Sequence, residues 1–245
     1  MQRYKITIEY DGSEFNGWQT QISSTGVQEC IEKSIYQFSG EKVKVFGAGR
    51  TDSGVHALGQ VAHFDLEKNL YTQNILNAIN FYLKPRKISI LNISKVDFNF
   101  HARFSAKSRS YLYKIINRES PLALEYNKAY LLKAPIDIEA MQQAASALIG
   151  THNLSSFRCA QCQASSPVKT INAINVSKLS EVIQINITAP SFLHKQVRII
   201  VGTLCKIGKK KIKPESIIDI LNAKDRSKAG PTAPACGLYL KNVSY

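Results

Sequence analysis

The 245-residue sequence is short of acidic side chains and contains no long apolar run. Asp and Glu total 18 against 32 Lys and Arg, which leaves a formal net charge of +14 at pH 7. Such a surplus on a folded protein favours a polyanionic partner, either nucleic acid or an anionic membrane. No segment approaches the roughly 20 apolar residues of a membrane-spanning helix, and the basic residues are spread along the chain. We therefore expect nucleic acid as the partner and no membrane association.

A secretion signal and a disulfide framework are also missing. MQRYKITIEY enters an alternating strand pattern at once, without the apolar stretch and cleavage site of a signal peptide, so we expect a cytoplasmic protein. The five cysteines are odd in number and irregularly spaced, which indicates reduced thiols. Cys159 and Cys162 form a single CxxC pair, which supplies two ligands where a structural zinc site needs four. We therefore expect no metal.

The hydrophobic pattern predicts alternating strands and helices. Hydrophobic residues make up 44% of the sequence, enough for one large domain or two small ones with cores of their own. Thr25 and Gln28 have the spacing of a capping box before a helix that starts near Val27, and Asp137 can cap another. Further helices are expected at about 75–83, at about 191–207 and after Pro214. Strands are expected at 4–10, 42–46, 60–64, 88–93, 111–116, 181–188 and 237–243.

A polar and basic stretch, SKVDFNFHARFSAKSRS at 94–110, interrupts this pattern, and the same plan then appears a second time. The stretch indicates a domain boundary, so we divide the chain into residues 1–103 and 104–245. The expected fold is α+β, with two related domains of mainly antiparallel sheet and helices on one face.

The most informative segment is GAGRTDSGVHALGQVAHF, residues 47–64. It concentrates glycines, an arginine, an aspartate and two histidines after one expected strand and into the next, a common setting for catalysis. Arg50 and Asp52 flank Thr51 and could point the same way in an extended loop. From the residues alone, a tight connection whose Asp caps a turn explains the segment equally well. It is not a dinucleotide-binding fingerprint, because Asp52 stands where the third glycine would be.

This segment resembles the active-site motif of the tRNA pseudouridine synthase A family, GxGRTDxGVHAxGQV. Further blocks resemble the family in the family's order, so the resemblance covers almost the whole chain. They are RYKITIEYDGSEFNGWQTQ near the start, FHARFSAKSRSYLY at 100–113, SFRCAQCQ at 156–163, FLHKQVRIIVG at 192–202 and GLYL at 237–240.

The resemblance implies roles for four residues. Asp52 would be the essential carboxylate, on the first domain, and Arg198 would pair with it from the second, with the active-site cleft between the two. Tyr111 would stack on the target base, and Arg50 would help to flip that base out of the RNA. Where the family usually has Met, this sequence has Gln196, which leaves the local packing open.

The role of Arg198 has a plainer alternative, and three neighbouring residues are given no functional role. Arg198 read alone is an exposed cation on a helix face, and Tyr113, which shares a strand face with Tyr111, is expected to be a core aromatic residue. His56 and His63 receive no catalytic or metal role.

The reaction breaks the N1–C1′ bond of uridine, turns the uracil and rejoins it through C5. A carboxylate is ionised at neutral pH and could attack C1′, attack C6 or remove the C2′ proton. The sequence does not choose among these three routes.

The resemblance also implies a substrate and an assembly. The substrate would be the anticodon stem-loop of tRNA, modified at more than one neighbouring uridine. The enzyme would be a homodimer in which one tRNA contacts both subunits, with no metal and no small-molecule cofactor. Two other readings are a non-catalytic RNA-binding protein, which would not need Asp52, and a hydrolase of a phosphorylated small molecule, for which the usual metal ligands are missing.

Overall fold

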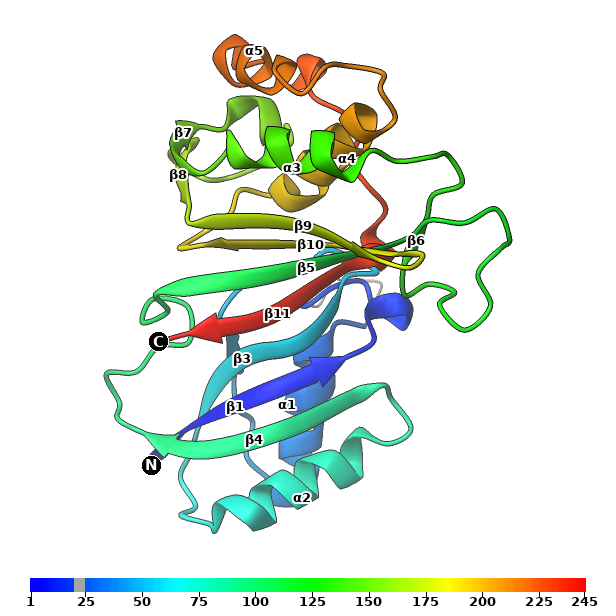
Figure 1. Cartoon of the computed structure of the whole chain (residues 1–245). Coiled ribbons are helices and arrows are strands. Elements are labelled where there is room, and N and C mark those ends of the chain that lie inside the picture. The colour runs from blue at the N-terminus through cyan, green and yellow to red at the C-terminus, as the bar shows by residue number, and fades with distance from the viewer. Residues whose placement is uncertain (20–24) are drawn as a thin grey trace. The chain divides into compact units, whose positions relative to one another are not determined.

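A computed structural model describes residues 1–19 and 25–245 of the chain. Its contacts divide the described residues into two compact units (Figure 1). Unit 1 comprises Met1–Lys107 and Tyr239–Tyr245, and unit 2 comprises Ser108–Leu238. Each unit contains an antiparallel sheet and helices, so the expected α+β class is confirmed.

The sheet of unit 1 is built around its first strand. β1 (Gln2–Tyr10) pairs antiparallel with both β3 (His56–Leu66) and β4 (Ile88–Val96). β3 also pairs antiparallel with the short β2 (Phe46–Gly47) and parallel with β11 (Leu238–Ser244). Two helices, α1 (Val27–Ser39) and α2 (Thr72–Leu83), cover one face of this sheet. A single 3-10 turn, η1 (Gly12–Glu14), follows β1.

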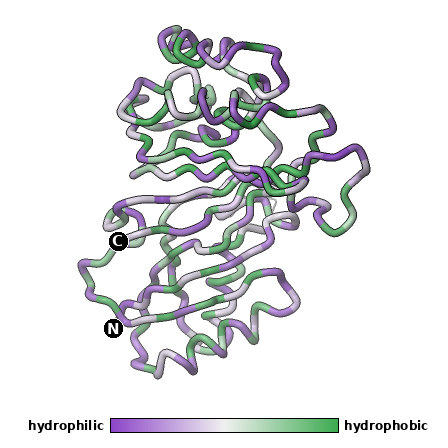
Figure 2. Tube along the Cα trace, in the orientation of Figure 1, coloured by the Kyte–Doolittle hydropathy of each residue, from purple (hydrophilic) through white to green (hydrophobic). Residues whose placement is uncertain are grey.

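The period-two alternation in β1 explains which face the helices cover. Every second residue of the strand is fully or almost fully buried, and Figure 2 shows hydrophobic and hydrophilic residues alternating along the strands. The apolar stripes of both helices close over this face, and burial of such side chains is worth about 1.5–3 kcal/mol each. The buried residues include Tyr4, Ile6, Ile8 and Tyr10 from β1, Cys30, Ile31 and Ile35 from α1, and Ile75, Ile79 and Leu83 from α2.

The opposite face of the unit 1 sheet carries a smaller apolar cluster. Ala48, Val61 and Ala102 are buried there, and Phe100 and Tyr245 pack against them. The Tyr245 hydroxyl donates a hydrogen bond of 2.8 Å to the Ala102 carbonyl oxygen. The segment before residue 105 and the C-terminus thus cover part of the face that the helices leave open.

Unit 2 repeats the plan with mainly antiparallel strands of its own. β10 (Val182–Ala189) pairs with β5 (Ser108–Ile116) on one side and β9 (Ala173–Leu179) on the other, and β6 (Tyr130–Leu131) pairs parallel with β5. β7 (Gly150–Asn153) and β8 (Val168–Ile171) form a separate hairpin-like pair. The helices are α3 (Ile138–Ser146), α4 (Gln196–Gly208) and α5 (Ser216–Ala223), with 3-10 turns η2 (Ser155–Phe157), η3 (Arg226–Lys228) and η4 (Ala235–Gly237).

Helix starts were partly predicted. The Asp137 side chain accepts a hydrogen bond of 3.0 Å from the Ala140 N–H, so this cap is confirmed. The capping box of Thr25 and Gln28 is wrong, because Gly26 is the N-cap of α1 and makes no side-chain cap bond. Helix α4 begins at Gln196 rather than near 191.

The expected strand at 42–46 is largely wrong too. Only Phe46 joins the sheet, because the Val45 N–H donates to a Glu32 carboxylate oxygen (2.9 Å) in place of a neighbouring strand. The delayed start of α4 has a similarly local cause, since Lys195 adopts a left-handed backbone conformation with φ of 61°.

The division into units differs from the sequence-based one. The contacts change at Ser108 rather than after residue 103, and residues 239–245, expected in the second domain, pack with unit 1. Pairing of β11 with β3 and a hydrogen bond of 2.8 Å from the Lys107 N–H to the Ser244 carbonyl oxygen hold the C-terminus there. Such long-range pairing leaves no trace in a local hydrophobic pattern.

Gly202 of α4 provides a test of the packing in unit 2. A Cβ at this position would overlap the carbonyl oxygen of Pro231. Alanine is normally favoured over glycine inside a helix by up to about 1 kcal/mol, yet we expect Gly202→Ala to lower the free energy of unfolding by about 1–3 kcal/mol through overpacking. Urea denaturation measures the change, with Asn222→Ala on the exposed face of α5 as the control. Equal or greater stability of Gly202→Ala would contradict this packing.

Candidate active site

The loop between β2 and β3, residues 48–55 and here called the Asp loop, is held by the segment that follows β1. Thr51 is buried, and its carbonyl oxygen accepts a hydrogen bond of 3.1 Å from the Trp18 N–H. Its hydroxyl shares a buried hydrogen bond of 2.8 Å with the Tyr10 hydroxyl. The residue that precedes Asp52 is therefore fixed through both its backbone and its side chain.

Glycine lets these two segments touch. Gly17 has a φ of +91°, and a Cβ there would overlap the Thr51 carbonyl oxygen, so the approach requires glycine in two respects. On the other side of Asp52, the Val55 N–H donates to the Asp52 carbonyl oxygen (3.1 Å). Gly54, inside that turn, has a φ of +76°, which glycine adopts without strain.

The ends of the Asp loop are held as well. The Gln60 side-chain amide donates to the Gly49 carbonyl oxygen (2.9 Å). His56 is buried, accepts the Gly12 N–H at Nδ1 (3.0 Å) and stacks on Tyr239 with ring centroids 4.6 Å apart. Its role in the structure is thus to join the loop to η1 and to the C-terminal strand.

Exposure alternates along the centre of the loop. Arg50 is exposed, Thr51 is buried and Asp52 is half-buried. The backbone around Asp52 is anchored on both sides, while the residue as a whole is only partly buried. This arrangement suits a fixed charge that acts on a bound molecule.

Tyr111 lies on β5 of unit 2, opposite Ile187 of β10. Its ring meets the edge of the Phe192 ring at 90°, with centroids 5.1 Å apart, and the residue is half-buried. Tyr113, two residues later, is fully buried and donates to the Pro234 carbonyl oxygen (2.7 Å). Burial raises the pKa of the Tyr113 hydroxyl far above its ordinary range, and its expected role as a core aromatic residue is confirmed.

Arg198 lies in the first turn of α4 and is half-buried rather than exposed. Its Nε donates to the Ala233 carbonyl oxygen (2.8 Å), and its own carbonyl oxygen accepts the Ala233 N–H (3.0 Å). Gln196, where the resembling family usually has Met, is buried and accepts the Leu193 N–H at Oε1 (2.7 Å). Within the described residues its Nε2 finds no hydrogen-bond partner. The substitution therefore places an amide in a packed position at the helix start.

The four residues expected at the site divide between the units. Asp52 and Arg50 belong to unit 1, and Tyr111 and Arg198 belong to unit 2.

All five cysteines are free thiols, and Cys159 Sγ lies 3.1 Å from His194 Nδ1. Across residues 1–19 and 25–245, no group of three or more His, Cys, Asp or Glu side chains is arranged to hold a metal ion. In the same part of the chain, no helix combines the length and the apolar character needed to cross a membrane.

Comparison with known proteins decides the family. The sequence model of a family described as tRNA pseudouridine synthase matches residues 6–105 and 144–245, one segment mainly in each unit. The chain belongs to the tRNA pseudouridine synthase family. The resemblance of its motifs is thereby confirmed, as is the expectation of two related α+β domains. Members of this family are isomerases that convert uridine in tRNA to pseudouridine.

Curated relatives match this pseudouridine synthase over its full length. It is 55% identical over 244 residues to the tRNA pseudouridine synthase A of Ehrlichia canis (strain Jake), covering 99% of this chain and 100% of that protein. It is 56% identical to the protein of the same name in Ehrlichia chaffeensis (strain ATCC CRL-10679 / Arkansas), and that alignment covers 99% of this chain and 100% of the relative. A chain in the solved structure titled "Crystal Structure of a Cbf5-Nop10-Gar1 Complex" aligns with 82% of this chain and 54% of its own, at 9% identity and a TM-score of 0.33, too remote to add to the assignment.

The residues that support the Asp loop were not predicted from the sequence. Tyr10, Phe15 and Trp18 lie in RYKITIEYDGSEFNGWQTQ, which was recognised as a block but interpreted only as a strand and a loop. In the structure, Phe15 contributes a carbonyl oxygen that accepts the Gly54 N–H (3.4 Å). The matching block was the available signal that this segment does more than connect.

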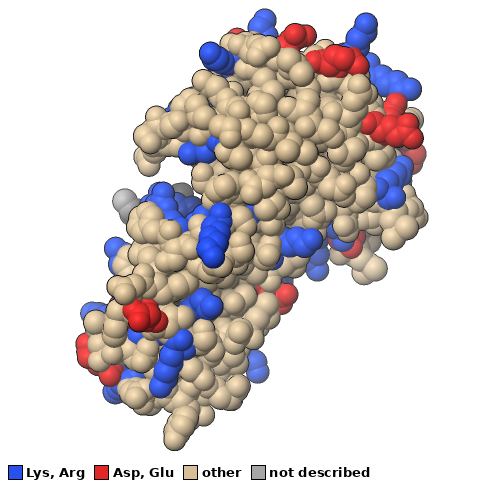
Figure 3. All heavy atoms as spheres, turned by 60° about the vertical axis from the view of Figure 1, so that its left-hand side comes forward, with Lys and Arg blue, Asp and Glu red and all other residues tan. Residues whose placement is uncertain are grey.

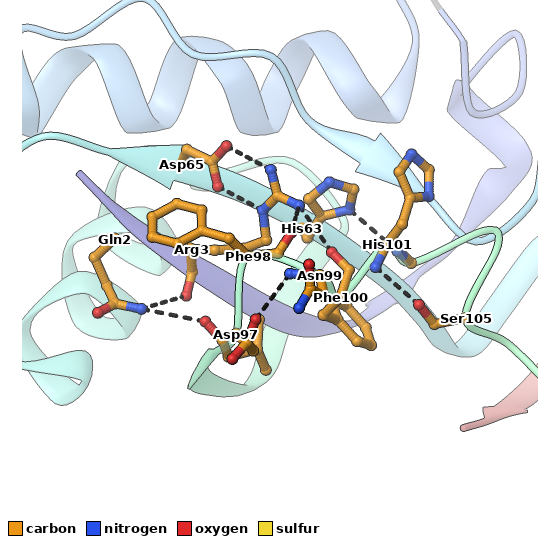
Figure 4. Close-up of polar contacts among 12 residues, drawn as sticks. Gln2, Arg3, His63, Asp65, Asp97, Phe98, Asn99, Phe100, His101 and Ser105 are labelled. Carbon is orange, nitrogen blue, oxygen red and sulfur yellow. Dashed lines mark hydrogen bonds and ion pairs between the residues drawn. The ribbon is translucent and has the colours of Figure 1, made fainter.

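A second polar network fixes the open face of the unit 1 sheet (Figure 4). The Arg3 guanidinium donates to both carboxylate oxygens of Asp65, at 2.8 Å each, and to the carbonyl oxygens of Phe98 (2.7 Å) and Phe100 (2.9 Å). This arginine holds the pKa of the Asp65 carboxyl below its ordinary value. One side chain therefore ties β3 to the segment that follows β4.

His63 of β3 lies beside this network (Figure 4). It is 1% exposed, accepts the Ala102 N–H at Nδ1 (3.2 Å), and burial, followed by the charge of Arg3, lowers its pKa from 6.5 to about 4. Between these values the unfolded chain binds a proton that the folded protein does not. The free energy of unfolding should therefore fall as pH falls from about 6.5 to about 4, by up to about 1.4 kcal/mol per pH unit.

Urea unfolding at several pH values tests this, with His63→Gln as the variant because glutamine can still accept the Ala102 N–H. The variant should show a clearly flatter pH dependence in that window. An undiminished slope in His63→Gln would show that other groups cause it.

Proposed function

We propose that Asp52 is the carboxylate that acts on the target nucleotide when this enzyme isomerises uridine in tRNA. The supporting observation is the anchored Asp loop. Thr51 is fixed through its carbonyl oxygen by Trp18 and through its hydroxyl by Tyr10, while Asp52 remains partly exposed. A charge held in place before the substrate arrives needs little reorganisation during the reaction, which is where much catalytic power originates.

The isomerisation requires a carboxylate of this kind and few other reacting groups. The N1–C1′ bond breaks, the uracil turns, and a C5–C1′ bond forms while C5 loses a proton and N1 gains one. No atom or electron is gained overall, so an isomerase of this kind needs neither oxidant nor reductant, and we propose that no metal or small-molecule cofactor takes part. Attack by the carboxylate at C1′, attack at C6 and removal of the C2′ proton all require Asp52 to touch the nucleotide.

Three further residues complete the proposed site on the bound nucleotide. Arg198 pairs with Asp52 and keeps it ionised once RNA excludes water. Tyr111 stacks on the uracil, since a π-face holds a turning base without one fixed set of hydrogen bonds. Arg50 occupies the place that the flipped base leaves in the RNA. The hydrogen bond from Arg198 to Ala233 and the contact of Tyr111 with Phe192 support these roles, because they restrict both side chains.

We propose the anticodon stem-loop of tRNA as the substrate and a homodimer in the cytoplasm as the working form, with one tRNA contacting both subunits. The charge supports an RNA partner. Lys and Arg exceed Asp and Glu by 14, and Figure 3 shows basic side chains spread over the face in view with few acidic ones among them. Neutralising phosphates releases counterions, which supplies most of the sequence-independent affinity for RNA.

The test is release of tritium from tRNA labelled at uracil C5. Replacing the carboxylate by a neutral amide of the same shape, Asp52→Asn, should lower the rate of release at least about 100-fold, because the group can then neither attack nor accept a proton. Its Kd for tRNA should stay close to that of the unchanged enzyme. Asp219→Asn, at an exposed position of α5, is the matched control and should release tritium at the normal rate.

Full activity of a correctly folded Asp52→Asn would disprove the proposed role. Binding of tRNA by the unchanged protein without any release would favour the non-catalytic RNA-binding reading. Failure to bind tRNA at all would favour the hydrolase reading.

A further inference from the structure

The rings of Phe46, His101 and Phe104 lie next to one another at the surface of unit 1. We call these three residues the aromatic patch. The ring centroid of His101 lies 4.4 Å from that of Phe104 and 5.8 Å from that of Phe46. Phe104 is 76% exposed and Phe46 is 38% exposed. Adjoining exposed aromatic side chains are costly in water and commonly mark a binding surface.

Hydrogen bonds and ring contacts of His101 and His63 hold the aromatic patch in place. Nδ1 of His101 accepts the backbone N–H groups of Arg103 (3.1 Å) and Phe104 (3.4 Å), and the backbone N–H of His101 donates to the Ser105 hydroxyl (2.9 Å). Figure 4 shows His101 beside His63, whose ring centroid is 4.7 Å away. His63 also stacks under Phe46 at 5.1 Å. The backbone that carries the patch is therefore fixed before a ligand binds, which lowers the entropic cost of binding.

The charges around the patch favour an anionic ligand. Lys44 Nζ lies 5.4 Å from the centre of the Phe46 ring, and the Arg103 guanidinium carbon lies 5.5 Å from the centre of the Phe104 ring. Nearby Asp65 is already paired with Arg3. Burial and the charges of Arg3 and Arg103 lower the pKa of His101, which favours its neutral form.

We propose that the aromatic patch stacks on an unpaired base of the tRNA close to the target uridine, with Lys44 and Arg103 at the adjoining phosphates. This inference rests on the proposed function, because it takes tRNA as the ligand. Aromatic faces interleaved with basic side chains suit single-stranded nucleic acid, since every base has a π-face and every nucleotide a negative charge.

The chain itself limits where that base lies. Phe46 precedes Asp52 by six residues, so their Cα atoms are at most about 20 Å apart. The patch is thus within a few nucleotides of a uridine held at Asp52. A stem-loop presents unpaired bases at that distance from its target.

The experiment compares Kd values for an unmodified tRNA transcript, by filter binding at one fixed salt concentration. Phe104→Ala should raise Kd about 5- to 150-fold, the range for loss of one stacked base. Phe104→Trp should bind as tightly as the unchanged enzyme, while Phe104→Leu, which keeps apolar surface but no π-face, should stay weakened. Phe81→Ala is the matched control, because Phe81 is 66% exposed on α2, and its Kd should change less than twofold.

An unchanged Kd in Phe104→Ala would overturn the proposal. Full recovery by Phe104→Leu would also overturn it, because simple apolar contact would then suffice. Sedimentation of each variant covers the remaining possibility: loss of a dimer with unchanged RNA affinity would assign the patch to contact between copies of this chain. Failure of the proposed function is separate, since it appears as persistent tritium release by Asp52→Asn, a measurement of turnover that is independent of the Kd change in Phe104→Ala.

Discussion

The position of Asp52 in this enzyme depends on the hydrogen bonds that Tyr10 and Trp18 make to Thr51. The Trp18 N–H meets the Thr51 carbonyl oxygen at 3.1 Å, and the Tyr10 hydroxyl meets the threonine hydroxyl at 2.8 Å. Each such hydrogen bond contributes a net 0.5–1.5 kcal/mol or so to stability, a modest amount. Their effect on geometry is larger, because both act on the residue next to Asp52, in a loop that has no regular structure of its own.

The first strand of the chain supports two functional surfaces at once. At its C-terminal end, Tyr10 points into the helix-covered core and holds the Asp loop. Near its N-terminal end, Arg3 lies on the opposite face and, through Asp65 and the carbonyl oxygens of Phe98 and Phe100, holds the segment that carries the aromatic patch. β3, which pairs with β1 along most of its length, follows the Asp loop and supplies His63 beneath the patch. A well-packed antiparallel sheet thus fixes two loops that could not fix themselves.

Local sequence patterns predicted the features that depend on neighbouring residues in the chain. The period of two in β1 gave the buried face, the cap at Asp137 followed from side-chain chemistry, and the burial of Tyr113 followed from its place in a strand. The family and the importance of the Asp loop came from matched motifs, because the residues alone left a plain turn as an equal reading. The features that were not predicted depend on contacts between residues far apart in the sequence. Nothing near Val45 shows that Glu32 will take its N–H, and nothing near residue 239 shows that the last strand will pair with β3.

The central claim is that a fixed Thr51 positions Asp52 for catalysis, and a double-mutant cycle on tritium release tests it most directly. Tyr10→Phe and Thr51→Val each remove one hydroxyl of the shared hydrogen bond with little change in shape. We predict that each lowers kcat about 2- to 12-fold, as loss of one such bond would, that KM changes little, and that the double variant is no slower than the slower single one. Equal kcat in all four proteins, or effects that simply multiply, would contradict the account.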